Sequence, residues 1–193
     1  MGGFVIPLLG PNAGFPGTVS RNGDELIVSR PLNIADTLTA AFGDIAVLDA
    51  NSIGGYWSSV QAAVAAGTSN ANILAAIAGI FTRNVKVDTT YPLFGASGAN
   101  QNSYIPGQLA DVLERGVITV QLRVFTVAPL AGGQIFVRTV LNGAIPAGVV
   151  GGIETAADGA NTIAIPTSFM GWKTGFVDPN GRTEIVVKER QNV

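Results

Sequence analysis

The sequence contains neither cysteine nor histidine. Without cysteine the chain forms no disulfide bond and offers no thiolate for catalysis. Without histidine it lacks the commonest general base, the commonest transition-metal ligand and the base of the usual serine triad. A serine–lysine pair needs only residues that are present, but no Ser-x-x-Lys spacing occurs. These absences predict a protein that is not an enzyme, with no catalytic residue, no cofactor and no metal site.

Charge is also scarce. Charged residues make up 12% of the 193 residues and hydrophobic residues 47%, and the mean hydropathy is +0.39. Disorder needs low hydrophobicity and high net charge, so we expect a folded chain. The 11 basic residues are scattered and the net charge is −2, which predicts no nucleic-acid partner. A chain this apolar either enters a membrane or covers much of its surface with other proteins.

No long apolar run supports membrane insertion. The most apolar window, residues 60–80, is interrupted at residues 67–70 and again at Asn72, whereas a spanning helix needs roughly 20 predominantly apolar residues. The first residues carry no basic group and are interrupted by Pro7 and Pro11. We interpret residues 1–14 as an N-terminal arm and not as a signal peptide. The sequence therefore predicts contact with other proteins and no membrane partner.

Glycine and proline, by contrast, are frequent. The 25 glycines and 10 prolines separate short apolar segments, a pattern typical of all-β proteins. Asx-Gly pairs favour tight hairpin turns because both residues tolerate positive φ. These pairs are Asn22-Gly23, Asn142-Gly143, Asp158-Gly159 and Asn180-Gly181. The flanking residues predict hairpins around the first and the last pair, and the last is the stronger prediction.

Further segments have the composition of β-strands. These segments are residues 44–48, 77–87, 117–127, 134–141 and 161–165. In 117–127 one alternating set is wholly apolar, which predicts an antiparallel sheet with one buried face. The set expected to point inward is Ile118, Val120, Leu122 and Val124. Because a Pro/Gly turn at residues 128–133 follows, we expect 117–127 and the strand after it to form a hairpin-like pair.

One region departs from the strand pattern. Residues 56–66 and 71–78 are rich in alanine and predict short helices, with Ser69 and Asn70 as caps between them. Residues 92–106 read as a long polar loop. We predict an all-β fold, an antiparallel β-sandwich or jelly-roll-like domain. Its parts are the arm 1–14, a single domain 15–187 with a helical insertion at about 56–78, and a C-terminal tail 188–193.

Paired carboxylates are the remaining candidates for chemistry, because a glycosidase on a β-sandwich needs only two. The pairs are Asp24/Glu25, Asp44/Asp49, Asp111/Glu114 and Glu154/Asp158. We expect each of them to be surface charge or part of an ion pair. The first pair sits at an expected turn, and Arg115 and Arg123 are near enough in sequence to neutralise the third.

Other binding motifs are missing. The glycines at 143, 148, 151 and 152 match neither a dinucleotide-binding turn nor a P-loop, and we interpret them as turn residues. No Asp-x-Asp-x-Asp-Gly calcium loop occurs. Tyr56, Trp57 and Trp172 could form an aromatic platform for a sugar, but we expect the two tryptophans to be buried in the core.

Several phrases, in order along the chain, resemble the structural cement (decoration) proteins of tailed-bacteriophage capsids. The family has a V-L-x-R-G-x-x-x-V strand, matched by residues 112–120, and an A-G-D-x-V-Y-V-R turn-strand, matched by 131–138. The other similar phrases are residues 14–21, 77–85, 104–107, 167–173 and 184–187. The chain departs from the pattern at Gly133, where the family often has aspartate, and in the alanine-rich insertion around 56–76.

This resemblance implies a protein without an active site that binds the outer face of an assembled phage head. Its expected partners are the major capsid protein and further copies of itself, as a homodimer or homotrimer. It would be made in the bacterial cytoplasm and end in the virion. Two alternatives stay open: another virion β-module, such as a tail or fibre component, and a carbohydrate-active β-sandwich that uses Asp111 and Glu114.

Overall fold

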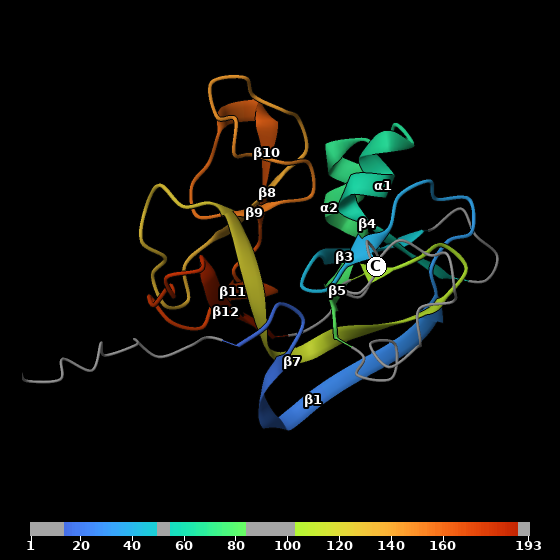
Figure 1. Ribbon diagram of the computed structural model, residues 1–193, viewed down its shortest axis with the longest axis horizontal. Helices are drawn as coiled ribbons and strands as arrows, with labels where there is room; N and C mark the ends of the chain where they lie inside the picture. The colour runs from blue at the N-terminus through green and yellow to red at the C-terminus, as the bar shows by residue number, and fades with distance from the viewer. Residues whose placement is uncertain (1–13, 50–54, 84–102, 189–193) are drawn as a thin grey trace, which may run out of the picture.

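The computed structural model describes residues 14–49, 55–83 and 103–188 (Figure 1). The strands, in chain order, are β1 (Val19–Pro31), β2 (Ala40–Ala41), β3 (Ile45–Asp49), β4 (Tyr56–Ser59), β5 (Ile77–Phe81), β6 (Ser103–Tyr104), β7 (Leu109–Val124), β8 (Ile135–Arg138), β9 (Ile153–Glu154), β10 (Thr162–Ile165), β11 (Met170–Trp172) and β12 (Arg182–Val187). The helices are α1 (Val60–Ala65), α2 (Asn70–Ala76) and the 3₁₀ turn η2 (Gly159–Asn161). The all-β class predicted from the sequence is confirmed.

Strand β7 is the central strand of the fold and pairs with β1, β5, β9 and β12. It has 16 residues. Its first half pairs with β1 on one edge and with β5 on the other, and Val112 and Leu113 have partners in both of these strands. Its second half pairs with β12 and, in parallel, with β9. Gly116 lies between the halves at φ +134°. Figure 1 shows β7 leaving the long β1–β7 ribbon and turning toward β8, β9 and β10.

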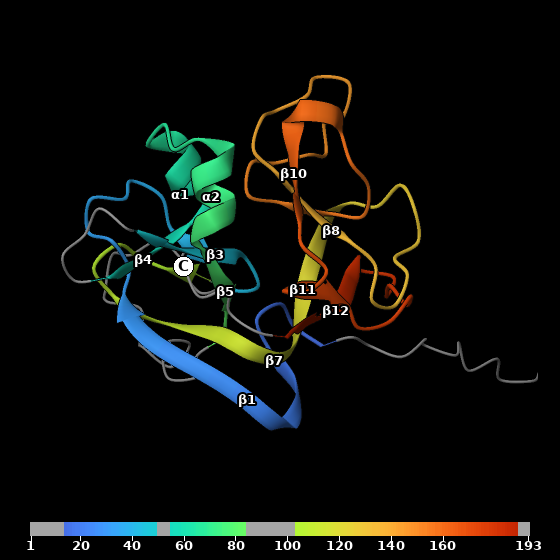
Figure 2. The same ribbon diagram turned by 180° about the vertical axis from the view of Figure 1, so that it is seen from behind.

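The sheet that contains β3 and β5 has a packed core on each face. Alternate residues of β3 divide between the two cores: Ile45 and Val47 join one, and Ala46 joins the other, as the alternation of side chains along a strand requires. The first core also includes Ile73 of α2 and continues into β8 and β10. Helices α1 and α2 lie together above β3 and β5 in Figure 1, and the view from behind in Figure 2 shows the same arrangement.

The second core contains the large aromatic residues of this half of the molecule. Trp57, Phe81 and Tyr104 are all 0% exposed. Phe42 meets the Tyr104 ring edge-on, with the ring centres 5.1 Å apart. The Tyr104 hydroxyl donates to the carbonyl of Thr82 at 2.9 Å, so the polar end of this buried ring is satisfied.

The inward face predicted for residues 117–127 is confirmed. All of its members, Ile118, Val120, Leu122 and Val124, are buried. The helices are also confirmed, although they are shorter than predicted. Ser59 and Ser69 accept hydrogen bonds from the first-turn N–H groups of α1 and α2, the usual role of an N-cap serine.

Residues 56–59 were expected to be helical, and this is wrong. They form strand β4, which pairs with β3 from Leu48↔Trp57 to Ala46↔Ser59. Burial of Trp57 in the second core overrides the weak helical preference of this short segment. The helix begins only after the Ser59 cap.

The hairpin-like pair expected between 117–127 and the next strand is also wrong. Strand β9 lies between β7 and β8: Ile153 is opposite Leu122 on one side and Val137 on the other. Glu154 of β9 supplies a carboxylate to buried Arg138 of β8. An unpaired buried guanidinium is strongly unfavourable, and in this strand order the charge of Arg138 is compensated.

The Asn22-Gly23 pair does not close a hairpin. Residues 19–31 form one strand that follows β7, and the register shifts between Arg21↔Val117 and Leu26↔Arg115. The Asx-Gly pair thus lies in a bulge, because the long apolar strand β7 offers a better ladder than a short hairpin. At the last pair the prediction is confirmed: Gly181, at φ +74°, donates its N–H to the Asp178 carbonyl at 2.9 Å.

Two strand predictions hold closely, since 44–48 and 161–165 correspond to β3 and β10. The strand expected over 77–87 ends at Phe81, and 84–87 lie outside the described residues. So do residues 1–13 of the predicted arm, 189–193 of the tail and 92–102 of the predicted loop. The division into arm, domain and tail remains a prediction.

Candidate functional site

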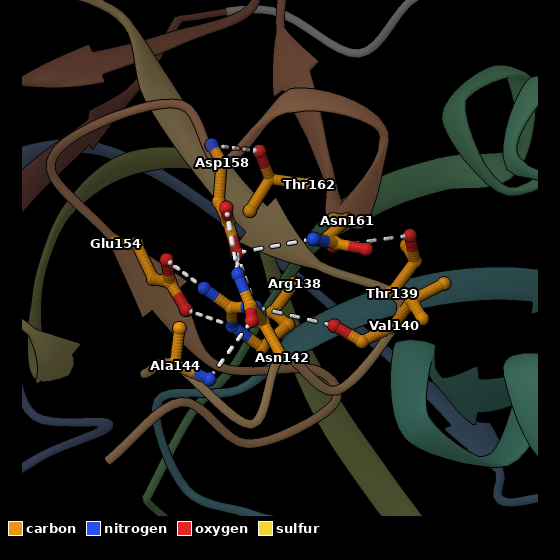
Figure 3. Close-up of polar contacts among 9 residues, drawn as sticks. All are labelled: Arg138, Thr139, Val140, Asn142, Ala144, Glu154, Asp158, Asn161 and Thr162. Carbon is orange, nitrogen blue, oxygen red and sulfur yellow. Dashed lines mark hydrogen bonds and ion pairs between the residues drawn. The ribbon is translucent and has the colours of Figure 1, made fainter. Parts of the chain in front are cut away.

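The most extensive polar structure described here surrounds Arg138 at the end of β8 (Figure 3). Arg138 is 0% exposed and Glu154, on the adjacent strand β9, is 2% exposed. The Arg138 Nη2 donates to Glu154 Oε2 at 2.9 Å, and Nε donates to Oε1, so the pair is bidentate. The Arg138 Nη1 donates to Asp158 Oδ2 at 2.8 Å and to the Val140 carbonyl at 3.2 Å.

Asp158 joins this pair to the loop that follows β8. The Asn142 side-chain amide donates to both carboxylate oxygens, at 3.1 and 3.0 Å, and the Asn161 amide donates to Oδ2 at 3.3 Å. The hydrogen bonds from Asn142 and Arg138 lower the pKa of Asp158. Two side-chain amides and one buried guanidinium thus hold the carboxylate ionised, which suits a structural role and not that of an acid or base catalyst.

The glycines of the 139–152 loop let its backbone pass close to these side chains. A Cβ atom on Gly148 would lie 2.4 Å from Arg138 Nε, and one on Gly152 would lie 2.8 Å from Arg123 Cγ. Gly151, at φ +81°, packs against Gln61 of α1. These turn residues therefore serve close packing and not anion binding.

The structure brings together the members of some predicted carboxylate pairs and not of others. Asp111 and Glu114 both lie in β7, and the pairing of β7 with β1 shifts register at Glu114, between Leu113 and Arg115. Glu114 is 5% exposed, whereas Asp111 is half-buried and its carboxylate accepts from the Ser29 hydroxyl. Glu154 and Asp158 are brought together, as an ion network around Arg138.

The other two pairs are not brought together as sites. Asp44 and Asp49 have different partners: Asp44 accepts from the Ala41 N–H at 3.2 Å, and Asp49 accepts from the Asn33 amide at 2.6 Å. Glu25 is exposed, and the side chain of Asp24 lies outside the described part of the chain. The tryptophans form no sugar platform, since Trp57 and Trp172 are both buried, as expected.

A polar pocket of about 240 Å³ lies between β3, α1 and the 149–152 segment, lined by Asp44, Gln61, Arg123 and the loop. Burial raises the pKa of Asp44 to about 6, although Arg123 and the Ala41 N–H oppose this rise. The pocket holds one carboxylate and one guanidinium, so its charge is balanced. It offers no nucleophile with an adjacent base.

One face of the β1–β7 ribbon exposes apolar side chains. Leu109 is 61% exposed, and Pro31 lies directly opposite it. Ile27 is 42% exposed on the same face, and Ile34, 77% exposed, lies beside Gly107 at the end of the ribbon. We call Ile27, Pro31, Ile34 and Leu109 the ribbon face. The hydrogen-bonded pair of Ser29 and Asp111 lies on this face between Ile27 and the Pro31–Leu109 pair. Exposed apolar side chains grouped on one face are typical of protein contact surfaces.

A second exposed feature combines an aromatic ring with positive charge. Phe15 is 56% exposed, and the Cζ atoms of Arg83 and Arg182 each lie 5.1 Å from its ring centre. We call these three residues the Phe15 cluster. The sequence places Phe15 in a Gly-Phe-Pro-Gly phrase but gives no sign of the two arginines, because these are distant in sequence.

Neither a metal centre nor a spanning helix is found in residues 14–49, 55–83 and 103–188. Those residues contain no group of three or more acidic side chains that could hold a metal ion. Their helices are all too short to cross a bilayer.

The chain is similar to a chain of a solved structure titled "The capsid of Myoviridae Phage XM1", with a TM-score of 0.61, 13% sequence identity, and coverage of 98% of this chain and 99% of that one. No curated protein matches the sequence. Residues 5–187 match the family described as XM1 gp53 minor capsid protein. Because that match spans nearly the whole chain, the protein belongs to the XM1 gp53 minor capsid protein family.

Proposed function

We propose that the protein is a capsid cement protein, which binds the outer surface of the assembled phage head and stabilises contacts between major capsid proteins. The observation that carries this proposal is membership of a minor capsid protein family over residues 5–187. A cement protein needs contact surface and no active site, and the described residues offer the ribbon face and no catalytic constellation.

The physical basis of such a function is linkage. A protein that binds the assembled lattice and not its separate subunits shifts the equilibrium toward the lattice. Many copies act together on one shell, so modest affinity at each position is enough. The low content of charge, 12% of residues, suits a protein that buries surface against several neighbours.

Self-association belongs to the same proposal. We propose a homodimer or homotrimer, because closed symmetric assemblies are the commonest form of soluble oligomer. Light scattering on the purified protein measures the mass directly. A monomer at all concentrations would contradict this part and leave binding to the head untouched.

The test uses phage heads that lack the protein. Purified protein is added to these heads, bound copies are counted by cryo-electron microscopy, and release of DNA on heating is followed with a fluorescent dye. We expect density on the outside of the head and a higher temperature of DNA release. Density on the tail, or no bound protein, would contradict the proposal.

A variant of the ribbon face tests whether this surface makes the contact with the phage head. Ile34→Ser with Leu109→Ser removes two apolar side chains that are 77% and 61% exposed, and Leu130→Ser with Leu141→Ser is matched at 74% and 66%. We expect the first pair to weaken binding to heads and the second to bind like wild type. Equal binding by both would exclude the ribbon face.

A further inference from the structure

Two Asn-Gly pairs, Asn142-Gly143 and Asn180-Gly181, have side chains that the structure describes. In such a pair the backbone nitrogen of the glycine can attack the Cγ carbon of the asparagine side chain, because the glycine has no Cβ atom to hinder the approach. The product of this attack is a cyclic succinimide. In a folded chain the rate depends on what holds the nitrogen and the side chain, and in this respect the two pairs differ.

The backbone nitrogen of Gly143 is accessible. Its N–H donates to none of the described residues, and the residue is exposed. A Cβ atom at this position would meet no atom within 4 Å, so the space around the nitrogen is open. Water or hydroxide can therefore reach the N–H group and take its proton.

The side chain of Asn142 is confined to one orientation (Figure 3). Its Oδ1 accepts from the Ala144 N–H at 3.0 Å, so the side chain folds forward over the peptide that joins Asn142 to Gly143, as in an Asx turn. The same N–H stabilises the negative charge that develops on Oδ1 when Cγ is attacked, as a donor of an oxyanion hole does. On the other side, Nδ2 donates to the two carboxylate oxygens of Asp158 at 3.1 and 3.0 Å.

The Asn180-Gly181 pair lacks these features. The Gly181 N–H donates to the Asp178 carbonyl at 2.9 Å, and a Cβ atom at Gly181 would lie 3.0 Å from Gln121 Nε2. The nitrogen is thus engaged and its surroundings are filled. The Asn180 side chain makes no hydrogen bond to the described residues, so nothing directs it toward Gly181.

We propose that Asn142 is a site of spontaneous deamidation, and that the reaction opens the polar network around Arg138. The Gly143 nitrogen loses its proton to hydroxide and forms a bond to Asn142 Cγ, the Cγ–Nδ2 bond breaks, and ammonia leaves with a proton taken from water. Water then opens the succinimide at one of its two carbonyls and gives aspartate or isoaspartate. In sum, one amide and one water become one carboxylate and one ammonium ion. The inference is independent of the proposed function.

The reaction replaces a donor by a negative charge inside the network. The Nδ2 group of Asn142 supplies hydrogen bonds to both oxygens of Asp158, and a carboxylate in its place faces the Asp158 carboxylate at the same separation. Two carboxylates this close repel one another, and Asp158 is a partner of Arg138. Isoaspartate also lengthens the backbone and displaces the Ile145 N–H from the Asn142 carbonyl, which it reaches at 2.9 Å. Deamidation therefore loosens the 139–152 loop.

The test follows deamidation of the full-length protein in mildly alkaline buffer by tryptic digestion and peptide mass spectrometry. Trypsin places Asn142 and Asn180 in separate peptides, residues 139–173 and 174–182, and fragment spectra separate Asn142 from Asn161. We expect Asn142 to convert several-fold faster than Asn180 in the folded protein. When the protein is digested before incubation, the folded contacts are absent and the two should convert at similar rates. Equal rates in the folded protein, or faster conversion of Asn180, would overturn the proposal.

Gly143→Ala is the matched variant for the attacking nitrogen. The added Cβ atom meets no other atom within 4 Å, so the contacts of Asn142 are kept, but the methyl group hinders the approach of the nitrogen to Cγ. Conversion of Asn142 should slow several-fold, and conversion of Asn180 should stay unchanged. If Asn142 converts as fast in this variant as in wild type, the Gly143 nitrogen is not the nucleophile and the proposal is wrong.

Asn142→Asp tests the consequence, because it carries one of the two products from the start. We expect a lower melting temperature than that of wild type and a smaller change in Asn180→Asp, whose side chain has no hydrogen bond to a described residue to lose. A wild-type melting temperature in Asn142→Asp would contradict the opening of the network. If this variant does not fold, aged wild-type protein is separated by charge on an ion exchanger. The fraction deamidated at Asn142 should then melt below the intact fraction, and equal melting would refute the proposal.

Discussion

Arg138 and Glu154 stand on adjacent strands and form a bidentate ion pair from which water is almost excluded. Removing one partner of such a pair leaves a buried charge without compensation and destabilises a protein by about 3–5 kcal/mol. We therefore expect Arg138→Met to lower the free energy of unfolding by that amount in urea denaturation. Lys173→Met, at an exposed lysine that follows β11, serves as the control and should change it by less than about 1 kcal/mol.

The double variant Arg138→Met with Glu154→Leu sharpens this prediction. Both charges are then absent, so no uncompensated group stays buried, and the loss should be smaller than for Arg138→Met alone. Equal loss in single and double variants would mean that packing, and not the uncompensated charge, dominates at this position.

A second prediction concerns Gly148, which packs against Arg138 in the same network. Its missing side chain leaves room for Arg138, whose Nε would lie 2.4 Å from a Cβ at this position. The arginine cannot yield, because its guanidinium is held by Glu154 and Asp158. We expect Gly148→Ala to destabilise by roughly 1–3 kcal/mol, as overpacking does in well-packed interiors.

Gly143 in the same loop is the matched control for Gly148. A Cβ at Gly143 would meet no atom within 4 Å, and neither glycine has a positive φ, so backbone strain does not enter the comparison. Gly143→Ala should leave thermal stability unchanged or raise it slightly. A similar loss in both variants would indicate that the loop is not packed on Arg138.

These residues also show how far the sequence leads. The alternation in β7 predicted Ile118, Val120, Leu122 and Val124 as buried, because period-2 patterns report local burial directly. The hairpin prediction failed because β9, which lies later in the chain, pairs between β7 and β8 and brings Glu154 to Arg138, sixteen positions away. No local pattern announces that a buried arginine will take a carboxylate from a later strand.

The exposed surfaces could not be located from the sequence, for a related reason. Apolar residues such as Leu109 and Ile34 look like core in a sequence, and only the ladder between β1 and β7 shows that the ribbon face is open. The Phe15 cluster draws on three segments, β12 among them. The family resemblance gave the function class, and the positions of the contacts came from the fold.

Asp158 predicts a loss of stability in acid. Its pKa is lowered in the folded state by Asn142 and Arg138, so the folded protein favours the ionised carboxylate more than the unfolded chain does. The stability that this carboxylate contributes is therefore present above its unfolded pKa, near 3.8, and is lost as the pH falls below it. Asp158→Asn should flatten the acid limb of stability against pH, measured by urea denaturation between pH 2.5 and 5. An acid limb as steep as that of wild type would assign the effect to other carboxylates.

For Asp44 we predict the opposite dependence of stability on pH. Burial raises its pKa in the folded state to about 6, from an ordinary value of 3.8. Between these values the folded protein binds a proton that the unfolded chain does not, so this group destabilises the fold progressively as the pH rises through the window, and the full penalty applies above about pH 6. The full difference corresponds to about 3 kcal/mol, and the partial exposure of Asp44 reduces it to about 1–2 kcal/mol. Asp44→Asn keeps an acceptor for the Ala41 N–H and should raise the free energy of unfolding at pH 7.5 while leaving it unchanged near pH 4. A gain of the same size at both pH values would show that the substitution acts through packing and not through the proton.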